Sequence, residues 1–164
     1  MLLENEQKVY AVLKELKIPF KKYEHNQIFT IEEANKLEIN IEGQHCKNLF
    51  LRNRKGNKHY LVIVDEWKKV DLKALSKNIG TASLSFASEE RLYSYLGVNP
   101  GSFTPFGLIN DIKKEVEVIL DKDIKKLKNI SFHPNVNTAT ITISYEDFER
   151  YLQWCENKIY YIDI

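Results

Sequence analysis

The sequence predicts an α/β domain of the mixed α+β type, in which helices flank a mixed β-sheet. Helix-like and strand-like segments interleave along the chain, two apolar runs flank a short polar turn, and a length of 164 residues suits one domain. The hairpin argues against a doubly wound parallel sheet. We therefore expect residues 1–164 to fold as one domain around a mixed sheet.

The first predicted elements are helical. Val9 and Leu13 stand at helical spacing and predict a helix over about residues 2–16, which Pro19 ends. Residues 30–33 read Thr-Ile-Glu-Glu, a capping box that predicts the start of a second, short helix.

A hairpin is expected next. Residues 48–51 and 60–64 are apolar, and the segment 54–57 between them contains Gly56, which suits a turn. The second run is apolar on both faces, so it predicts a strand that is covered on both sides.

Capped helices and short strands complete the chain. Asp71 and Gly80 are expected to bound one helix, and Ser88 and Gly97 another. The remaining predicted elements are a short strand at 84–86, a half-exposed strand at 116–120, a strand at 138–143, a helix capped by Ser144 and Asp147, and a last strand at 159–164.

Composition excludes several classes of protein. Lysine and arginine total 24 against 23 acidic residues, so the net charge of +1 gives no general attraction to nucleic acid. No window approaches the roughly 18 apolar residues of a membrane span, and the start lacks the pattern of a signal peptide. Cys46 and Cys155 form no CxxC pair, which favours free thiols in the cytoplasm.

Common catalytic motifs are absent from the sequence. It contains no HExxH, CxxC, GxSxG or glycine-rich phosphate loop, and its four histidines are scattered, so no metal site is expected. His45 beside Cys46 does not form a catalytic pair, because neighbours on a strand point to opposite faces.

Three features could carry chemistry, and the first is Lys47 at the start of an apolar strand. Its ammonium would lie near the core, where it favours an anionic partner; the alternative is a surface charge. The second is the loop 97–105, with two glycines and two prolines, where Gly101 would let a ligand approach the backbone. An ordinary connector is the alternative reading.

The third feature is His133, beside Pro134 and before a threonine-rich strand whose hydroxyls line one face. A histidine that is satisfied within a turn would look the same. A basic cluster on the hairpin could contact a phosphate backbone or form a solvated tip; it consists of Arg52, Arg54, Lys55 and Lys58.

Taken in order, these features resemble the YbaK/ProX superfamily of aminoacyl-tRNA editing domains. Within it, the chain is most similar to the freestanding PrdX-like branch that deacylates alanyl-tRNA for proline, and the resemblance extends from about Lys47 to the C-terminus. The matching segments are 47–51, 84–92, 101–105, 104–111, 132–134 and 137–140.

The resemblance implies a twisted, mostly antiparallel sheet flanked by helices, and a hydrolase that needs no metal or organic cofactor. Lys47 stands at the family's essential lysine, and Asn48 at a polar residue near the bound terminal adenosine. The other substrate-binding residues that it implies are Gly101, Ser102, Phe103, Thr104, Pro105, His133, Asn137 and Thr138. Of the basic cluster, Arg52, Arg54 and Lys55 are the expected tRNA contacts.

A size argument explains why such an enzyme is needed. Alanine is smaller than proline, so a synthetase pocket that accepts proline cannot exclude it by size, and a second, tighter pocket can. We therefore expect editing of Ala-tRNA(Pro) in the cytoplasm, with mischarged tRNA as partner, a transient contact with prolyl-tRNA synthetase, and neither membrane nor DNA. The alternatives are a deacylase for cysteine, serine or threonine and a noncatalytic tRNA- or synthetase-binding module. A small-molecule ester or amide hydrolase has no nucleophile motif to support it.

Overall fold

The computed structural model describes residues 2–26 and 44–164, and its centre is an eight-stranded sheet. The predicted helix at Thr30 lies outside the described residues. In the order in which they pair, the strands are β1 (Lys21–Glu24), β7 (Ala139–Ser144), β6 (Asn129–Phe132), β2 (Gln44–Arg52), β3 (His59–Asp65), β5 (Val116–Asp121) and β8 (Ile159–Ile162), while β4 (Ser85–Phe86) pairs with β2 alone.

The pairings confirm a mixed sheet. β1–β7, β7–β6, β2–β3 and β2–β4 are antiparallel, whereas β2–β6, β3–β5 and β5–β8 are parallel. Antiparallel pairs therefore hold a small majority. The predicted hairpin is confirmed as β2 and β3, joined by a turn in which Gly56 has a left-handed φ of 72°.

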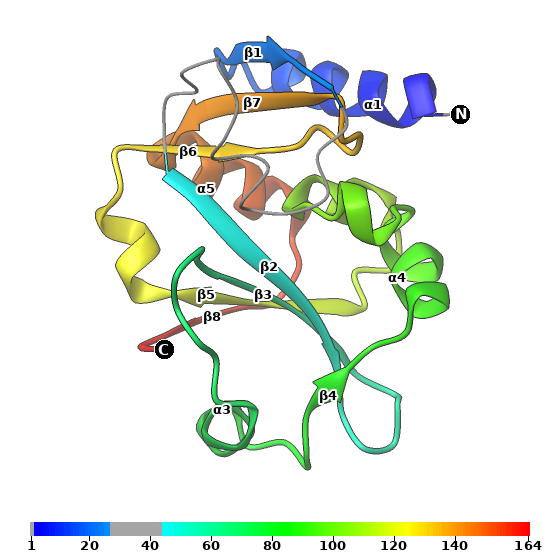
Figure 1. The fold of residues 1–164 in the computed structure, drawn as a ribbon, viewed down its shortest axis with the longest axis vertical. Helices are drawn as coiled ribbons and strands as arrows, with labels where there is room; N and C mark the ends of the chain where they lie inside the picture. The colour runs from blue at the N-terminus through cyan, green and yellow to red at the C-terminus, as the bar shows by residue number, and fades with distance from the viewer. Residues whose placement is uncertain (1, 27–43) are drawn as a thin grey trace.

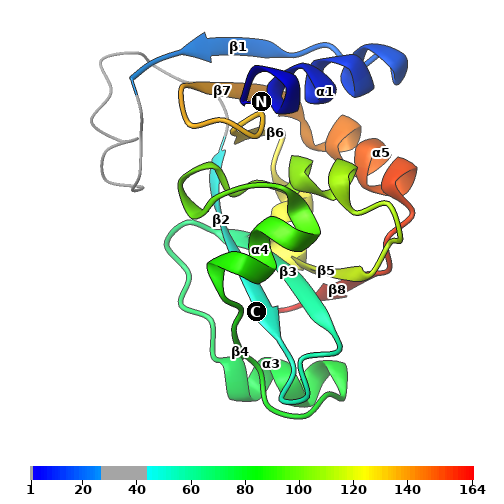
Figure 2. The ribbon, with the colours of Figure 1, turned by 90° about the vertical axis from the view of Figure 1, so that its right-hand side faces the viewer.

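Helices flank the sheet on several sides (Figures 1 and 2). α1 and α5 lie at the end that carries β1, β7 and β6, and α3 lies at the opposite end, near the β2–β3 hairpin. The helices are α1 (Leu2–Glu15), α3 (Leu72–Ile79), α4 (Glu89–Leu96) and α5 (Tyr145–Cys155), and the 3₁₀ turns are η1 (Pro100–Ser102), η2 (Pro105–Asn110) and η3 (Lys122–Lys126). None of the helices in the described part of the chain is long and apolar enough to cross a membrane.

The predicted helix ends are confirmed by their caps. The side chain of Asp71 accepts hydrogen bonds from Lys73 N and Ala74 N, and that of Ser88 accepts one from Arg91 N. Gly80 and Gly97 end α3 and α4 with left-handed φ angles of 69° and 65°. Ser144 likewise accepts a hydrogen bond from Asp147 N at the start of α5.

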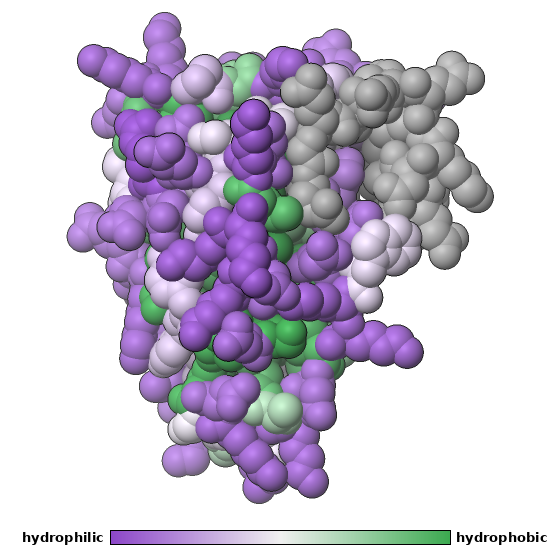
Figure 3. Space-filling model, turned by 90° about the vertical axis from the view of Figure 1, so that its left-hand side faces the viewer, coloured by the Kyte–Doolittle hydropathy of each residue, from purple (hydrophilic) through white to green (hydrophobic). Residues whose placement is uncertain are grey.

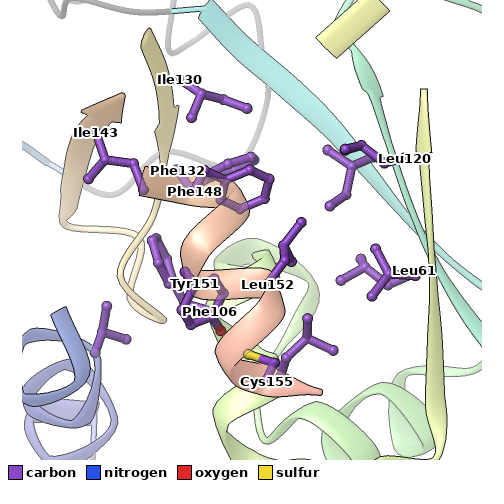
Figure 4. Close-up of a cluster of buried hydrophobic side chains, with 14 of the residues drawn as sticks. Leu61, Phe106, Leu120, Ile130, Phe132, Ile143, Phe148, Tyr151, Leu152 and Cys155 are labelled. Atoms are coloured by element: carbon purple, nitrogen blue, oxygen red, sulfur yellow. The ribbon is translucent and has the colours of Figure 1, made fainter. Parts of the chain in front are cut away.

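The sheet separates two apolar clusters. Along β3, Leu61 and Ile63 join the larger cluster, while Tyr60, Val62 and Val64 join the smaller one, which confirms a strand covered on both sides. The larger cluster contains the aromatic rings of Phe106, Phe132, Phe148 and Tyr151, which gather around α5 in Figure 4. The smaller cluster is covered by α3 through Leu75. Seen from the left-hand side of Figure 1, hydrophilic residues surround an area of hydrophobic ones (Figure 3).

The prediction of a half-exposed strand at 116–120 is wrong. β5 lies between two parallel neighbours, β3 and β8, and all of its residues except Glu117 are buried. Glu117 is itself half-covered, because it accepts a hydrogen bond from Tyr160 Oη at 2.8 Å. Glu117 thus faces the neighbouring strand β8 rather than open solvent.

Candidate active site

Strand β2 carries the first two candidate residues in a segment that lies between its pairing with β6 and its pairing with β4. β6 pairs with β2 at Gln44 and His45, whereas β4 pairs with it only at Leu51 and Arg52. Lys47 and Asn48 lie in the segment between these two pairings. On the other edge, β3 continues unbroken past both residues and fixes their position.

Lys47 is half-buried, and its ammonium is held by the backbone. Nζ donates a hydrogen bond to the carbonyl oxygen of Lys68, in the turn that follows β3. An ammonium has three N–H donors, so this contact leaves two for a ligand. Lys47 forms no ion pair with any described residue, and its positive charge is therefore not neutralised by a described carboxylate.

Asn48 joins the lysine segment to the glycine and proline loop. Its Nδ2 donates to the carbonyl oxygen of Phe103 at 3.4 Å. Its Oδ1 is buried and has no hydrogen-bond partner among the described residues. A cavity of about 190 Å³ opens beside this contact, with Phe86 and Leu92 among its other lining residues. The structure thus joins Asn48, the residue after Lys47, to the loop, with an unused acceptor at the contact. The ammonium of Lys47 lies against Lys68 instead, and no contact with the loop is found for it among the described residues.

The loop is stiff, as predicted, because two 3₁₀ turns and several hydrogen bonds fix it. Ser102 N donates to Asn99 O at 2.9 Å, and Phe106 N donates to Thr104 Oγ1 at 3.3 Å. Thr104 and Pro105 are buried, and Pro105 O accepts from Tyr151 Oη of α5 at 2.9 Å. Gly101 does not have a left-handed φ.

Gly107 holds the loop close to α4. A Cβ at this position would lie 2.9 Å from Leu96 Cβ and 3.0 Å from Leu96 O, closer than real contacts allow. The missing side chain therefore sets the spacing between η2 and α4.

Three asparagines that sequence reasoning missed tie the loop to distant parts of the chain. Asn110 Nδ2 donates to Leu96 O at 2.9 Å and to Asn5 Oδ1 at 3.2 Å. Asn135 Nδ2 donates to Asn5 Oδ1 at 3.2 Å and to Phe106 O at 3.3 Å. Asn135 has a left-handed φ of 62°, which asparagine adopts more readily than most residues, and this was the only local signal.

His133 follows β6 and is fixed by a backbone contact. Its Nδ1 lies 2.8 Å from Ala139 O, and because a carbonyl oxygen can only accept, Nδ1 carries the proton. Burial lowers the pKa of His133 below its usual value, against an opposing effect of that hydrogen bond, so the ring is neutral and Nε2 is an acceptor. This supports the reading of a histidine satisfied within a turn.

The strand register relates His133 to Lys47. His45 stands opposite Ser131 in the parallel β2–β6 pair, and both candidate residues follow two positions later in the same direction. Asn137 is half-buried and the side chain of Thr138 is exposed. No hydrogen bond joins either residue to Lys47 or to the loop in the described part of the chain, so their substrate-binding roles stay predictions.

Residues 25–151 match the family model of the aminoacyl-tRNA editing domain. The chain belongs to this family. It is 47% identical over 150 residues to the prolyl-tRNA editing protein ProX of Acetoanaerobium sticklandii, an alignment that covers 92% of each chain. It is 34% identical to prolyl-tRNA synthetase associated domain-containing protein 1 of Xenopus laevis, over 90% of this chain and 89% of that one.

Solved structures agree with the editing-domain fold. The crystal structure of a candidate trans-editing enzyme for prolyl tRNA synthetase has a TM-score of 0.72 with 18% identity, over 98% of this chain and 97% of that chain. At this identity the similarity establishes the fold alone. The match covers the sheet and its flanking helices, including the elements that carry Lys47 and the loop.

A thiolate and a metal site are two other kinds of catalytic group to look for among the described residues. Burial, with smaller effects of nearby carboxylates, raises the pKa of the Cys46 thiol, so it is no thiolate nucleophile. Among the residues that the structure describes, no three His, Cys, Asp or Glu side chains are placed to hold a metal ion.

A third arginine, Arg91 of α4, lies beside the basic hairpin of this editing domain. Arg91 of α4 donates to Gly56 O at 3.0 Å, and Arg54 donates to Ser83 Oγ at 3.2 Å. Arg52, Arg54, Lys55 and Arg91 form no ion pair with any residue in the described ranges. Their charges are therefore available to an external anion.

Proposed function

We propose that this protein hydrolyses alanine from tRNA that carries the proline anticodon, acting in trans on the mischarged product. The observation that carries the proposal is the position of Lys47 and Asn48. They lie in the segment of β2 between its pairing with β6 and its pairing with β4, and Asn48 donates a hydrogen bond to Phe103 of the stiff loop. Family membership and the prolyl-tRNA editing name of the 47% identical relative support the same reaction.

The chemistry needed is modest, because the bond is an activated ester. Water attacks the carbonyl carbon, the bond from that carbon to the ribose oxygen breaks, and the ribose oxygen takes up a proton. Backbone carbonyls of the loop and the substrate's own ribose hydroxyl are the proposed positioning groups for the water. Lys47, with two free N–H donors, holds either the developing oxyanion or the terminal phosphate.

The stiffness of the loop suits selection by size. A pocket that admits alanine and excludes the proline ring must not yield, and the loop is held by η1, η2, Tyr151 and the three asparagines. Removal of a methylene or two discriminates by only about 1–3 kcal/mol in a synthetase, which leaves room for a second filter.

We propose that the basic cluster contacts the tRNA. We also propose that the reaction takes place in the cytoplasm. Arg52, Arg54 and Lys55 lie on the hairpin, and Arg91 adds a charge from α4. Phosphate contacts of this kind supply affinity without reading sequence. A transient contact with prolyl-tRNA synthetase would place the editing domain close to newly charged tRNA.

The test is release of labelled amino acid from alanyl-, cysteinyl-, seryl- and prolyl-tRNA that carry the proline anticodon. Wild type should release alanine and spare proline. Lys47→Ala should lower turnover by at least about 10²-fold, the usual effect of losing one oxyanion donor, without unfolding the domain. Lys69→Ala removes an exposed ammonium nearby and is the matched control.

Each outcome of this panel has a defined meaning. Release of cysteine or serine in preference to alanine would assign another substrate. Turnover by Lys47→Ala equal to that of Lys69→Ala would refute both roles of Lys47. Tight tRNA binding without turnover would indicate a noncatalytic module.

A further inference from the structure

We propose that Lys68 and Asp121 are positioning residues that hold the ammonium of Lys47 in place. The inference rests on the proposed function. Because Lys47 Nζ donates to the backbone oxygen of Lys68, the place of that backbone decides where the ammonium lies. A charge that stabilises a transition state must be held in advance by its surroundings.

The backbone of Lys68 is fixed first by the turn after β3. Lys68 N donates to Asp65 O at 3.1 Å, and Trp67 N donates to Asp65 Oδ1 at 3.0 Å. Asp65 pairs with Cys46 in the β2–β3 ladder, so the turn begins directly beside the strand that carries Lys47.

The side chain of Lys68 fixes the same residue from the other side. Its Nζ lies 2.6 Å from Asp121 Oδ2 and 2.6 Å from Asp123 Oδ2, and it donates to Ile164 O at 3.0 Å. Asp121 is fully buried, and a buried carboxylate is stable as an anion only when it is paired. The contacts that its ammonium makes with the carboxylates of Asp121 and Asp123 raise the pKa of Lys68 and keep it charged.

Asp121 is itself well anchored. It ends β5, accepts a hydrogen bond from Asp123 N at 3.3 Å, and accepts another from Ile164 N at 3.4 Å. The side chain of Asp123 is half-exposed, so solvent screens its share of the pairing. Polar contacts thus run from Asp121 to Lys68 and from the Lys68 carbonyl to Lys47, across the sheet from β5 to β2.

Loss of the buried anion should move the reactive ammonium without removing it. Asp121→Asn keeps the shape of the side chain but no longer holds the Lys68 ammonium, which is then free to follow the exposed Asp123. A displacement of about 1 Å at a catalytic group lowers rates by up to about 10²-fold. We expect kcat to fall by about 10- to 100-fold, with little change in KM if Lys47 meets the oxyanion and with a raised KM if it holds the terminal phosphate.

Asp111→Asn is the matched control. Asp111 is also a buried aspartate, but it accepts hydrogen bonds from Val116 N at 2.9 Å and from Asn157 Nδ2 at 2.8 Å, at the other end of β5. Its replacement should lower stability and leave kcat per folded molecule unchanged. Equal losses of kcat in the two variants would refute a positioning role.

A second readout does not need turnover. The side-chain ammonium signal of Lys47 in a ¹H–¹⁵N spectrum, assigned by its loss in Lys47→Ala, should shift or broaden in Asp121→Asn and stay in place in Asp111→Asn. An unchanged signal in Asp121→Asn would overturn the proposal. Because this readout is independent of hydrolysis, it still decides the contact if wild type proves inactive on every aminoacyl-tRNA.

A conservative pair covers the case in which Asp121→Asn does not fold. Lys68→Arg keeps a cation opposite Asp121 and should retain most of the wild-type kcat, whereas Lys68→Gln should lose it. Equal kcat values in these two variants would refute the proposal.

Discussion

The loop at residues 101–105 contacts strand β2 at Asn48, the residue next to Lys47, yet different forces hold the loop and the lysine. The loop is anchored by buried rings and asparagine amides: Phe106 contacts Phe132 and Tyr151, and Asn135 binds the loop backbone. The lysine is anchored by a carbonyl and, behind it, the ion pair of Lys68 with Asp121.

The difference corresponds to two tasks. A wall that excludes a slightly larger amino acid must resist deformation, and dense apolar packing gives that resistance. A cation that meets a developing anion must keep free donors and an unneutralised charge. A carbonyl partner leaves the charge unneutralised, whereas a carboxylate partner would neutralise it. Packing should therefore govern which amino acid is accepted, and charge should govern how fast it is released.

The largest expected change in stability comes from a substitution among the buried rings that anchor the loop. Phe106→Ala removes a fully buried ring that contacts Phe132 and Tyr151, and should lower the free energy of unfolding by about 3–5 kcal/mol. The loosened loop should also begin to admit proline. Urea denaturation and the release assay on prolyl-tRNA measure the two consequences.

Phe86 provides the matched control, because it is 64% exposed and its replacement by Ala should change stability by at most about 0.5 kcal/mol. If Phe106→Ala lost stability but still spared prolyl-tRNA, the link between packing and selection would be wrong.

His59, at the hairpin end of β3, tests how the charge of a buried side chain affects the free energy of unfolding. Burial, and then Arg91 and Arg52, lower the pKa of His59 to about 4, against about 6.5 in an unfolded chain. Because the unfolded state takes up the proton first, His59 contributes stability that is complete above pH 6.5 and is lost as the pH falls toward 4.

Acidification from pH 7 to 4.5 should therefore remove about 2–3 kcal/mol through this residue. His59→Phe keeps a ring against Phe50 and Tyr95 and should flatten that part of the pH profile. Urea denaturation at the two pH values measures it. Equal slopes for wild type and variant would assign the acid sensitivity to other groups, such as His133, whose pKa burial also lowers.

The smallest effect should come from reversing exposed charge. Arg54→Glu with Lys55→Glu should weaken tRNA binding and reduce its salt dependence by about one unit of slope for each lost phosphate contact, while stability stays within about 0.5 kcal/mol. Lys77→Glu, on exposed α3, is the control. Unchanged affinity would place the tRNA on another face.

Local signals explain why much of the fold could be predicted from the sequence. Asp71, Gly80, Ser88 and Gly97 act on backbone atoms within four residues, so the ends of α3 and α4 could be located from the sequence. The exposure of β5 could not, because its neighbours β3 and β8 are far away in the chain and their register decides what Glu117 faces.

The candidate site also contains features that the sequence indicates and contacts that it does not. The prediction that Lys47, the loop and His133 form one site rests on resemblance to a family and not on their residue types. The contacts that hold them join positions far apart in sequence, such as Asn5 with Asn135 and Lys68 with Asp121, which local patterns do not encode. Thr104 shows a further limit: its hydroxyl caps a turn in the core, which the motif alone does not reveal.

Gly107 has a practical consequence for anyone who wishes to redirect the enzyme toward another amino acid. A Cβ at this position would force Leu96 or the backbone beside it to shift, so a randomised library that includes this position should contain many destabilised clones. A library should instead vary residues 101–103. Gly107 and Asn110 should be kept constant, because they hold the loop in place beside α4.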